Sequence, residues 1–166
     1  YPTNSNQPVT ISRADIRNLK DIAQSNRRYR ARFCAHFSVD DDVHEMVIYH
    51  KKGTYIRPHK HLMKTESYLL LEGKINIVLF DDYGKPLNVI EMGDFNTGDA
   101  FFFRMPNPMF RTLILKQDSV FLEVKKGPFN LGHVQWATWA PHHEEKDKVK
   151  KYIDQLSLSL KEFVTQ

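Results

Sequence analysis

The sequence predicts an antiparallel β-sandwich or β-barrel with an amphipathic helix near each end of the chain. Runs rich in Val, Ile, Leu and Phe recur at intervals of about 8 to 12 residues, with Gly or Asp turns between them, which is typical of an all-β fold. Residues 13–24 and 144–163 instead place apolar side chains at helical spacing. At 166 residues, 41% of them hydrophobic and 27% charged, the chain suits a single domain over residues 1–166 with one core.

The N-terminal part, residues 1–26, is expected to contain an arm and a short helix. Ser12 followed three residues later by Asp15 is a helix-capping pattern, and apolar residues follow on one face, so we predict a helix over Arg13–Gln24. Four arginines then alternate with aromatic residues between Arg27 and Phe33. This strip is either an anion-binding strip for phosphate, pyrophosphate or nucleic acid, or an edge strand whose charges discourage pairing, and we favour the edge strand.

The barrel is expected within residues 28–141. Its predicted strands are Val43–Tyr49, Ser67–Leu71, Lys74–Phe80, Leu87–Met92, Ala100–Phe103, Arg111–Leu115 and Val120–Val124. We expect the turn at Glu72 and Gly73 to close one hairpin and the turn at residues 117–119 to close another. The chain is expected to be irregular after Pro128, and residues 143–164 should form a C-terminal helix that packs on the barrel or on a partner.

The composition narrows the classes of function. One cysteine, Cys34, rules out an internal disulfide and points to a reducing compartment, so we expect a cytoplasmic protein. No apolar run is long enough to span a membrane. A formal net charge of +4 favours anionic small molecules, and nucleic-acid binding is a weak alternative because the arginine strip lacks the context of a recognition helix.

The stretch from Gly53 to Gly73 carries the strongest functional signal. His59 and His61 fall on the same side of an extended strand, because successive side chains point to opposite faces. Glu66 follows five residues later, where a returning strand can bring its carboxylate to the same point. Two imidazoles and a carboxylate that converge in this way predict a site for a divalent transition metal such as Fe, Mn, Ni or Zn.

The same stretch resembles the cupin superfamily. It fits the first cupin motif, G-x5-H-x-H-x4-E-x6-G, at every fixed position, and the segments TYIRPHKH, INIVLFDDYGK, VFLEVKKGPFN and WATWAP are similar to the WbuC-type cupins associated with bacterial O-antigen and surface-polysaccharide genes. This resemblance implies a jelly-roll β-barrel, a homodimer, and a metal held by His59, His61 and Glu66.

The second cupin motif, P-x-G-x-x-H, is altered in this chain. The matching run is residues 106–111, in which Pro108 stands at the glycine position and Arg111 at the position of the fourth metal ligand. A guanidinium cannot ligate a metal, since it has no free lone pair. Three outcomes remain open: the metal is held by the first motif alone; another histidine, His36, His44 or His50, stands in; or the metal is absent, and Arg111 pairs with Glu66 or grips an anionic ligand.

These observations lead to three function hypotheses. The first is a metal-dependent cupin that binds or converts a sugar or sugar nucleotide of surface polysaccharide, with Arg57 and Arg111 facing its phosphate or carboxylate. The second is a metal-free sugar-nucleotide isomerase or epimerase, in which His59 or His61 moves a proton and Tyr68 is a candidate acid. The third is a ligand-binding module without catalysis.

Overall fold

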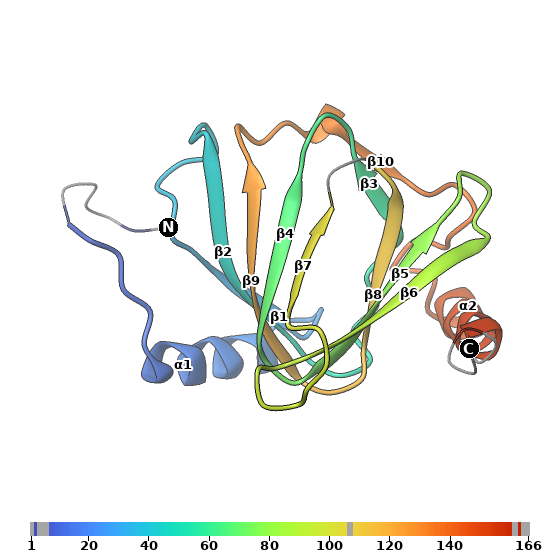
Figure 1. Cartoon of the computed structure of the whole chain (residues 1–166), viewed down its shortest axis with the longest axis horizontal. Coiled ribbons are helices and arrows are strands. Elements are labelled where there is room, and N and C mark those ends of the chain that lie inside the picture. Colours follow the sequence, from blue (N-terminus) through green and yellow to red (C-terminus); the bar gives the residue numbers. More distant parts are fainter. Residues whose placement is uncertain (1, 3–6, 106–107, 161–162, 164–166) are drawn as a thin grey trace.

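The computed structural model describes residues 2, 7–105, 108–160 and 163 of the chain. Two antiparallel five-stranded sheets pack face to face, and helices α1 and α2 lie against their outer surfaces (Figure 1). The predicted jelly-roll β-barrel with a helix near each end is therefore confirmed. Neither of the two helices in these ranges is long and apolar enough to cross a membrane.

Each sheet draws its strands from distant parts of the sequence. The first sheet has the order β1 (Arg30–Cys34), β2 (Val43–His50), β9 (Ser119–Lys126), β4 (Glu66–Glu72) and β7 (Phe102–Met105). The second has the order β10 (Val134–Trp136), β3 (His59–His61), β8 (Phe110–Leu115), β5 (Lys74–Phe80) and β6 (Pro86–Gly93).

Helix α1 spans Arg13–Gln24, as predicted from its capping pattern. The Ser12 hydroxyl accepts a hydrogen bond from the backbone N–H of Asp15, and the Asp15 carboxylate accepts one from the backbone N–H of Ser12. The apolar face of α1 covers the outer surface of the first sheet, where the cluster contains Leu19, Ala23, Val47, Tyr49 and Val120. Beside it, β1 is an edge strand of that sheet, as we favoured for the arginine strip.

The predictions of hairpins at Gly73 and at residues 117–119 are both wrong. Strand β4 pairs with β7 and β9, whereas β5 pairs with β6 and β8, so the chain changes sheets at Gly73. Strands β8 and β9 also belong to different sheets. The physical reason lies at Gly73, whose φ of 90° turns the chain away from β4. A side chain at this position would collide with Asp118 and Ser119.

The C-terminal part differs from its prediction in two ways. The stretch expected to be irregular contains a short 3₁₀ helix, Leu131–His133, and strand β10, which pairs with β3. Helix α2 spans Lys146–Ser159, shorter than the predicted 143–164, and residues 161–162 and 164–166 lie outside the described residues. It packs on the outer face of the second sheet in a cluster with Val78, Phe80, Phe110, Ala137, Ala140, Leu156 and Leu160.

The space between the sheets is apolar at one end and polar at the other. The apolar part contains Met46, Ile48, Leu70, Ile75, Ile77, Met92, Leu113, Leu115 and Phe121. Along β4 the inward positions run from Leu70 to Glu66, and along β8 they run from Leu113 to Arg111. The polar ends of these strands define the candidate site.

Candidate metal centre

Strand register brings the polar inward side chains to one end of the barrel. Glu66 on β4 lies opposite Lys125 on β9, and His59 on β3 lies opposite Arg111 on β8. Glu123, two positions before Lys125, shares its side of β9 because side chains alternate along a strand. Residues from four strands therefore lie at the same end of the barrel.

Arg111 and Glu66 form an ion pair inside the barrel. The Nε of Arg111 contacts Oε1 of Glu66, and only 1% and 3% of the two residues' surfaces are exposed. The Nη1 of Arg111 donates a hydrogen bond of 2.8 Å to the carbonyl of His59. Burial raises the pKa of Glu66, and the positive charge of Arg111 opposes this shift. The residue that replaces the usual fourth ligand thus occupies one oxygen of the motif carboxylate.

The second oxygen of Glu66 faces a group of possible metal ligands. Its Oε2 lies 3.7 Å from Nε2 of His61, and ligand atoms of His61, Glu66 and Glu123 all lie within 4.8 Å of one another. This Oε2 is buried and has no hydrogen-bond partner among the described residues. Burial and the charge of Arg111 lower the pKa of His61 to about 2, so at neutral pH its imidazole is uncharged, the form that binds metals.

Glu123 was not predicted from the sequence. Its position on β9 places it beside β4 only through pairing between residues far apart in the chain. The one local signal is the alternation along Phe121, Glu123 and Lys125, which puts two charged groups on the inward face of an otherwise apolar strand. Glu123 also contacts Lys125, with 3.2 Å between Oε1 and Nζ.

His59 lies next to this group but outside the set of three. Its ring centroid is 5.2 Å from that of His61 and 5.1 Å from that of Trp136. Its Nδ1 lies 2.9 Å from the carbonyl oxygen of Arg57, which can only accept, so Nδ1 carries the proton and Nε2 keeps the lone pair. Burial and Arg111 lower the pKa of His59 to about 3.

The two other predicted ligand-binding residues have partners within the protein. Arg57 donates a hydrogen bond of 2.8 Å to the carbonyl of Ala137, and its guanidinium lies 5.9 Å from the ring of Trp136. Tyr68 is 4% exposed, and its hydroxyl interacts with Arg111 and Glu66 of the site; burial, the largest cause, raises the pKa of this hydroxyl well above its usual value. Their roles toward a ligand stay predictions.

The three histidines considered as stand-in ligands lie elsewhere. The rings of His36 and His44 stack on each other at 4.1 Å, and His44 Nε2 donates to the carbonyl of Val39. His50 sits opposite Arg30 and stacks on Phe121, near the other end of β2. Among the described residues, none of them joins the group of His61, Glu66 and Glu123. His44 lies in the same row of the first sheet as Glu66, opposite Lys125, but its ring stacks on His36.

The altered second motif borders the site. Of its residues, Pro106 and Asn107 lie outside the described residues. A shallow depression at the metal group is lined by His61, Lys64, Glu66, Met105, Pro108, Met109 and Arg111. In this arrangement the depression leaves no space for a water-sized molecule.

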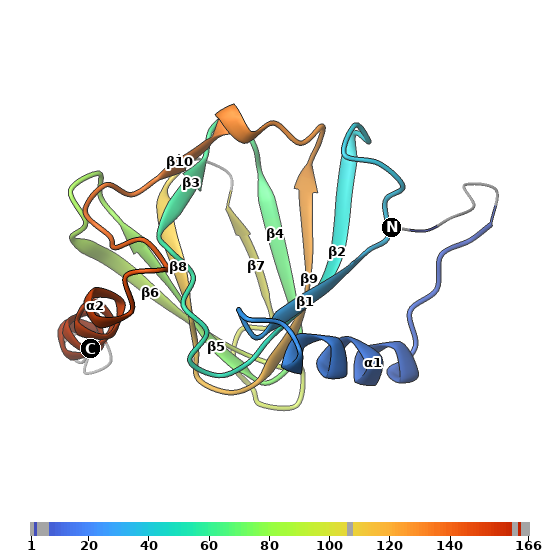
Figure 2. The ribbon, with the colours of Figure 1, turned by 180° about the vertical axis from the view of Figure 1, so that it is seen from behind.

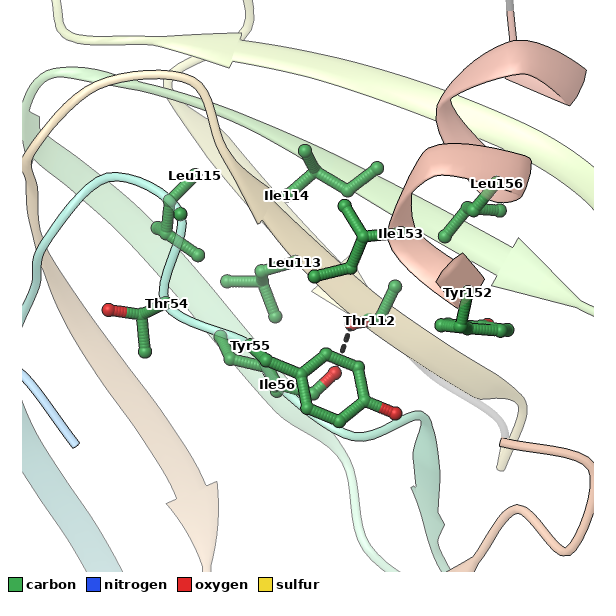
Figure 3. Close-up of a pocket in the computed structure, with 11 residues that line it drawn as sticks. Thr54, Tyr55, Ile56, Thr112, Leu113, Ile114, Leu115, Tyr152, Ile153 and Leu156 are labelled. Atoms are coloured by element: carbon green, nitrogen blue, oxygen red, sulfur yellow. Dashed lines mark hydrogen bonds between the residues drawn. The ribbon is translucent and has the colours of Figure 1, made fainter. Parts of the chain in front are cut away.

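A second depression lies outside the barrel. It is formed by residues 53–56, β8 and α2, and comprises about 380 Å³ when its part open to solvent is included (Figure 3). Its walls are mostly apolar, with Ile114, Ile153 and Leu156 among them. It contains no group of metal-binding side chains, so the candidate site is the one inside the barrel.

The fold is a jelly-roll barrel of the cupin type, and one end of it contains a group of possible metal ligands. A family described as a domain of unknown function (DUF6016) matches residues 11–92, just under half of the chain, a range that includes His59, His61 and Glu66. A search of curated protein sequences found no significant match.

Solved structures give distant similarities. Protein SO0799 from Shewanella oneidensis is 14% identical, with a TM-score of 0.51 over 64% of this chain and 72% of that chain. Oxalate decarboxylase from Bacillus subtilis is 14% identical, with a TM-score of 0.49 over 64% of this chain and only 27% of that chain. A cupin superfamily protein from Desulfitobacterium hafniense is 14% identical, with a TM-score of 0.46 over 58% of this chain and 76% of that chain. At such identities the likeness shows the fold alone.

Proposed function

We propose that this cupin-type barrel binds a divalent transition metal through His61, Glu66 and Glu123. The observation that carries the proposal is the buried Oε2 of Glu66, which has no hydrogen-bond partner among the described residues and lies 3.7 Å from His61 Nε2. An unpaired buried carboxylate oxygen is costly, and a metal ion at this point would satisfy it together with two further donors.

Charge balance sets how tightly such an ion is held. Glu66 and Glu123 supply two negative charges, but Arg111 and Lys125 each contact one of them. The two cations already neutralise nearly all of the negative charge of the glutamates before a metal binds. We therefore expect the metal to bind more weakly than it would in a site with a histidine in place of Arg111. In this arrangement Arg111 holds Oε1 of Glu66 and leaves Oε2 free for the ion.

A bound metal would supply a Lewis acid that polarises an oxygen of a ligand. The cationic groups of Lys64, Lys125 and Arg111 around it favour a ligand that is anionic. A sugar or sugar nucleotide, and a role in surface-polysaccharide synthesis, are supported by the resemblance to WbuC-type cupins. A homodimer is supported by the same resemblance and by the exposed side chains of Phe95 and Phe102 near edge strand β7.

The metal-free isomerase is less well supported. It needs an imidazole whose pKa lies near the working pH, whereas the pKa values of His59 and His61 are lowered to about 3 and about 2. Tyr68, its candidate acid, is buried in the core. A ligand-binding module without catalysis would use the same three donors as the metal-dependent protein.

The metal content of protein purified without chelator tests the proposal. We expect about one transition-metal ion per chain, and a large loss of metal in His61→Ala and Glu123→Gln. The matched control is Glu45→Gln, since Glu45 is an exposed carboxylate on the outer side of β2. A wild-type protein without metal after incubation with each candidate ion would remove the proposal.

A further inference from the structure

The arginines of β1 form a second group of charged side chains that the metal centre does not use. Arg30 and Arg32 share the face of β1 that is turned away from α1, since Ala31 and Phe33 pack in the α1 cluster. Arg28 lies in the turn before β1, two residues ahead of Arg30. The backbone carbonyl of Tyr29 accepts a hydrogen bond from Lys51, which holds this segment against the chain that leads toward β3 (Figure 2).

These three charges have no acidic partner in the described part of the chain. Within the described part of the chain, neither Arg28, Arg30 nor Arg32 forms an ion pair with an acidic side chain. Arg30 is half-buried, and its pKa is lowered to about 10 by burial and by the charges of Arg28 and Arg32. A desolvated guanidinium flanked by two like charges is unfavourable unless an anion joins it.

His50 adds an independent observation at the same place. It lies directly opposite Arg30 in the pairing of β1 with β2, and it is 5% exposed. Its Nδ1 is buried and has no hydrogen-bond partner among the described residues. Burial and the charges of Arg30 and Arg28 lower the pKa of His50 to about 3. A polar atom left unpaired beside an unbalanced arginine indicates a missing partner.

Protection of a sheet edge explains only part of this arrangement. Exposed arginines on an edge strand discourage pairing with another chain, and Arg28 and Arg32 are exposed. Arg30 does not serve that purpose, because it is half-buried and faces a buried histidine. Its position fits ligand binding better than edge protection.

We propose that Arg28, Arg30 and Arg32, with His50 beside Arg30, bind a multiply charged anion of the phosphate class, such as a diphosphate. Guanidinium groups pair with phosphate oxygens through two hydrogen bonds. Alternate side chains on a strand lie about 7 Å apart, so Arg30 and Arg32 on β1 hold opposite ends of a diphosphate rather than one carboxylate. The recessed position of Arg30 favours a small ligand over nucleic acid. This site does not depend on the metal centre.

The proposal is tested by measuring the binding of inorganic pyrophosphate to the full chain, with calorimetry and thermal denaturation. The buffer contains a chelator, so that no metal is bound, and its ionic strength is held constant. Wild-type protein should bind pyrophosphate and be stabilised by it. Arg30→Gln should unfold at a higher temperature than wild type in the absence of ligand, because it removes an unbalanced charge, and should bind pyrophosphate at least about tenfold more weakly. Arg28→Gln, at an exposed position, should also weaken binding.

The control is Arg104→Gln, an exposed arginine on β7 that should leave pyrophosphate binding unchanged. Absence of pyrophosphate binding by wild-type protein would overturn the proposal, as would wild-type affinity in Arg30→Gln. Binding of single-stranded DNA without binding of pyrophosphate would also overturn it and would assign the strip to nucleic acid. The Glu123→Gln variant, which removes a metal ligand, should bind pyrophosphate like wild type, so the two proposals fail independently.

Discussion

Arg111, which stands at the histidine position of the second cupin motif, forms a buried ion pair with Glu66. The pair fixes one oxygen of the motif carboxylate and leaves the other facing His61. This contact joins a residue of the first motif to one of the second.

Loss of the arginine from this pair should strongly destabilise the protein. Arg111→Met leaves the Glu66 carboxylate buried and uncompensated, and we expect the free energy of unfolding to fall by about 3–5 kcal/mol. The double variant Arg111→Met with Glu66→Leu should recover most of this loss, because no buried charge remains unpaired. Urea denaturation of the two variants checks this, and equal stability of single and double variants would contradict it.

Replacement of Arg111 by histidine should increase metal affinity. The change removes a positive charge from the site and supplies an imidazole at the fourth ligand position, so we expect metal affinity to rise by about a hundredfold or more. Competition with a chromophoric chelator measures the affinity, and Arg104→His on β7 is the control for an added histidine elsewhere. An unchanged affinity would show that Arg111 does not limit metal binding.

The two glycines that bound the first motif should tolerate alanine to different extents. Both have positive φ, but a Cβ at Gly53 has open space, whereas one at Gly73 lies 2.3 Å from the carbonyl oxygen of Asp118. Gly53→Ala should cost about 1–2 kcal/mol of backbone strain. Gly73→Ala should lower the free energy of unfolding, measured by urea denaturation, considerably more than Gly53→Ala does. Similar losses in the two variants would contradict the close packing of Gly73 against Asp118.

Buried neutral histidines make stability depend on pH. The pKa values of His50 and His59 are lowered to about 3, first by burial, whereas the unfolded chain binds protons below about pH 6.5. Their contribution is therefore fully present above pH 6.5 and is lost as the pH falls toward 3. We expect a decline of up to about 1.4 kcal/mol per pH unit for each histidine in urea denaturation.

A variant of His50 isolates this effect. His50→Gln should give a shallower decline between pH 6 and 4, an interval that lies within the window set by these pKa values, about 3 to 6.5. The exposed His142, with 46% of its side chain accessible, supplies the control His142→Gln, which should keep the wild-type slope. A wild-type slope in His50→Gln would mean that His50 is not held neutral in the folded protein.

Local signals in the sequence predicted local structure well. Helix α1 and strand β5 have the predicted bounds, because a capping box and a run rich in Ile, Val and Leu each specify an element without reference to the rest of the chain. The corner at Gly73 could not be predicted in this way. Two apolar strands on either side of a glycine turn look alike whether they pair in one sheet or pass between two packed sheets.

The residues of the candidate site were likewise predicted where the signal is local in the sequence and missed where it depends on strand pairing. His61 and Glu66 belong to one short motif, so their convergence could be predicted from spacing. The pairing of Arg111 with Glu66 was one of three open alternatives, because spacing does not show which partner a buried guanidinium takes. Glu123 was missed since its approach to Glu66 depends on the pairing of β9 with β4.

The most direct test of the metal centre is anomalous X-ray diffraction from crystals grown with the metal that the purified protein retains. We predict one anomalous peak inside the barrel, within coordination distance of His61 Nε2, Glu66 Oε2 and a carboxylate oxygen of Glu123, with Arg111 still paired to Oε1. No peak at this point in metal-saturated crystals, or a peak bound by His59 without Glu123, would contradict the assignment of these three ligands.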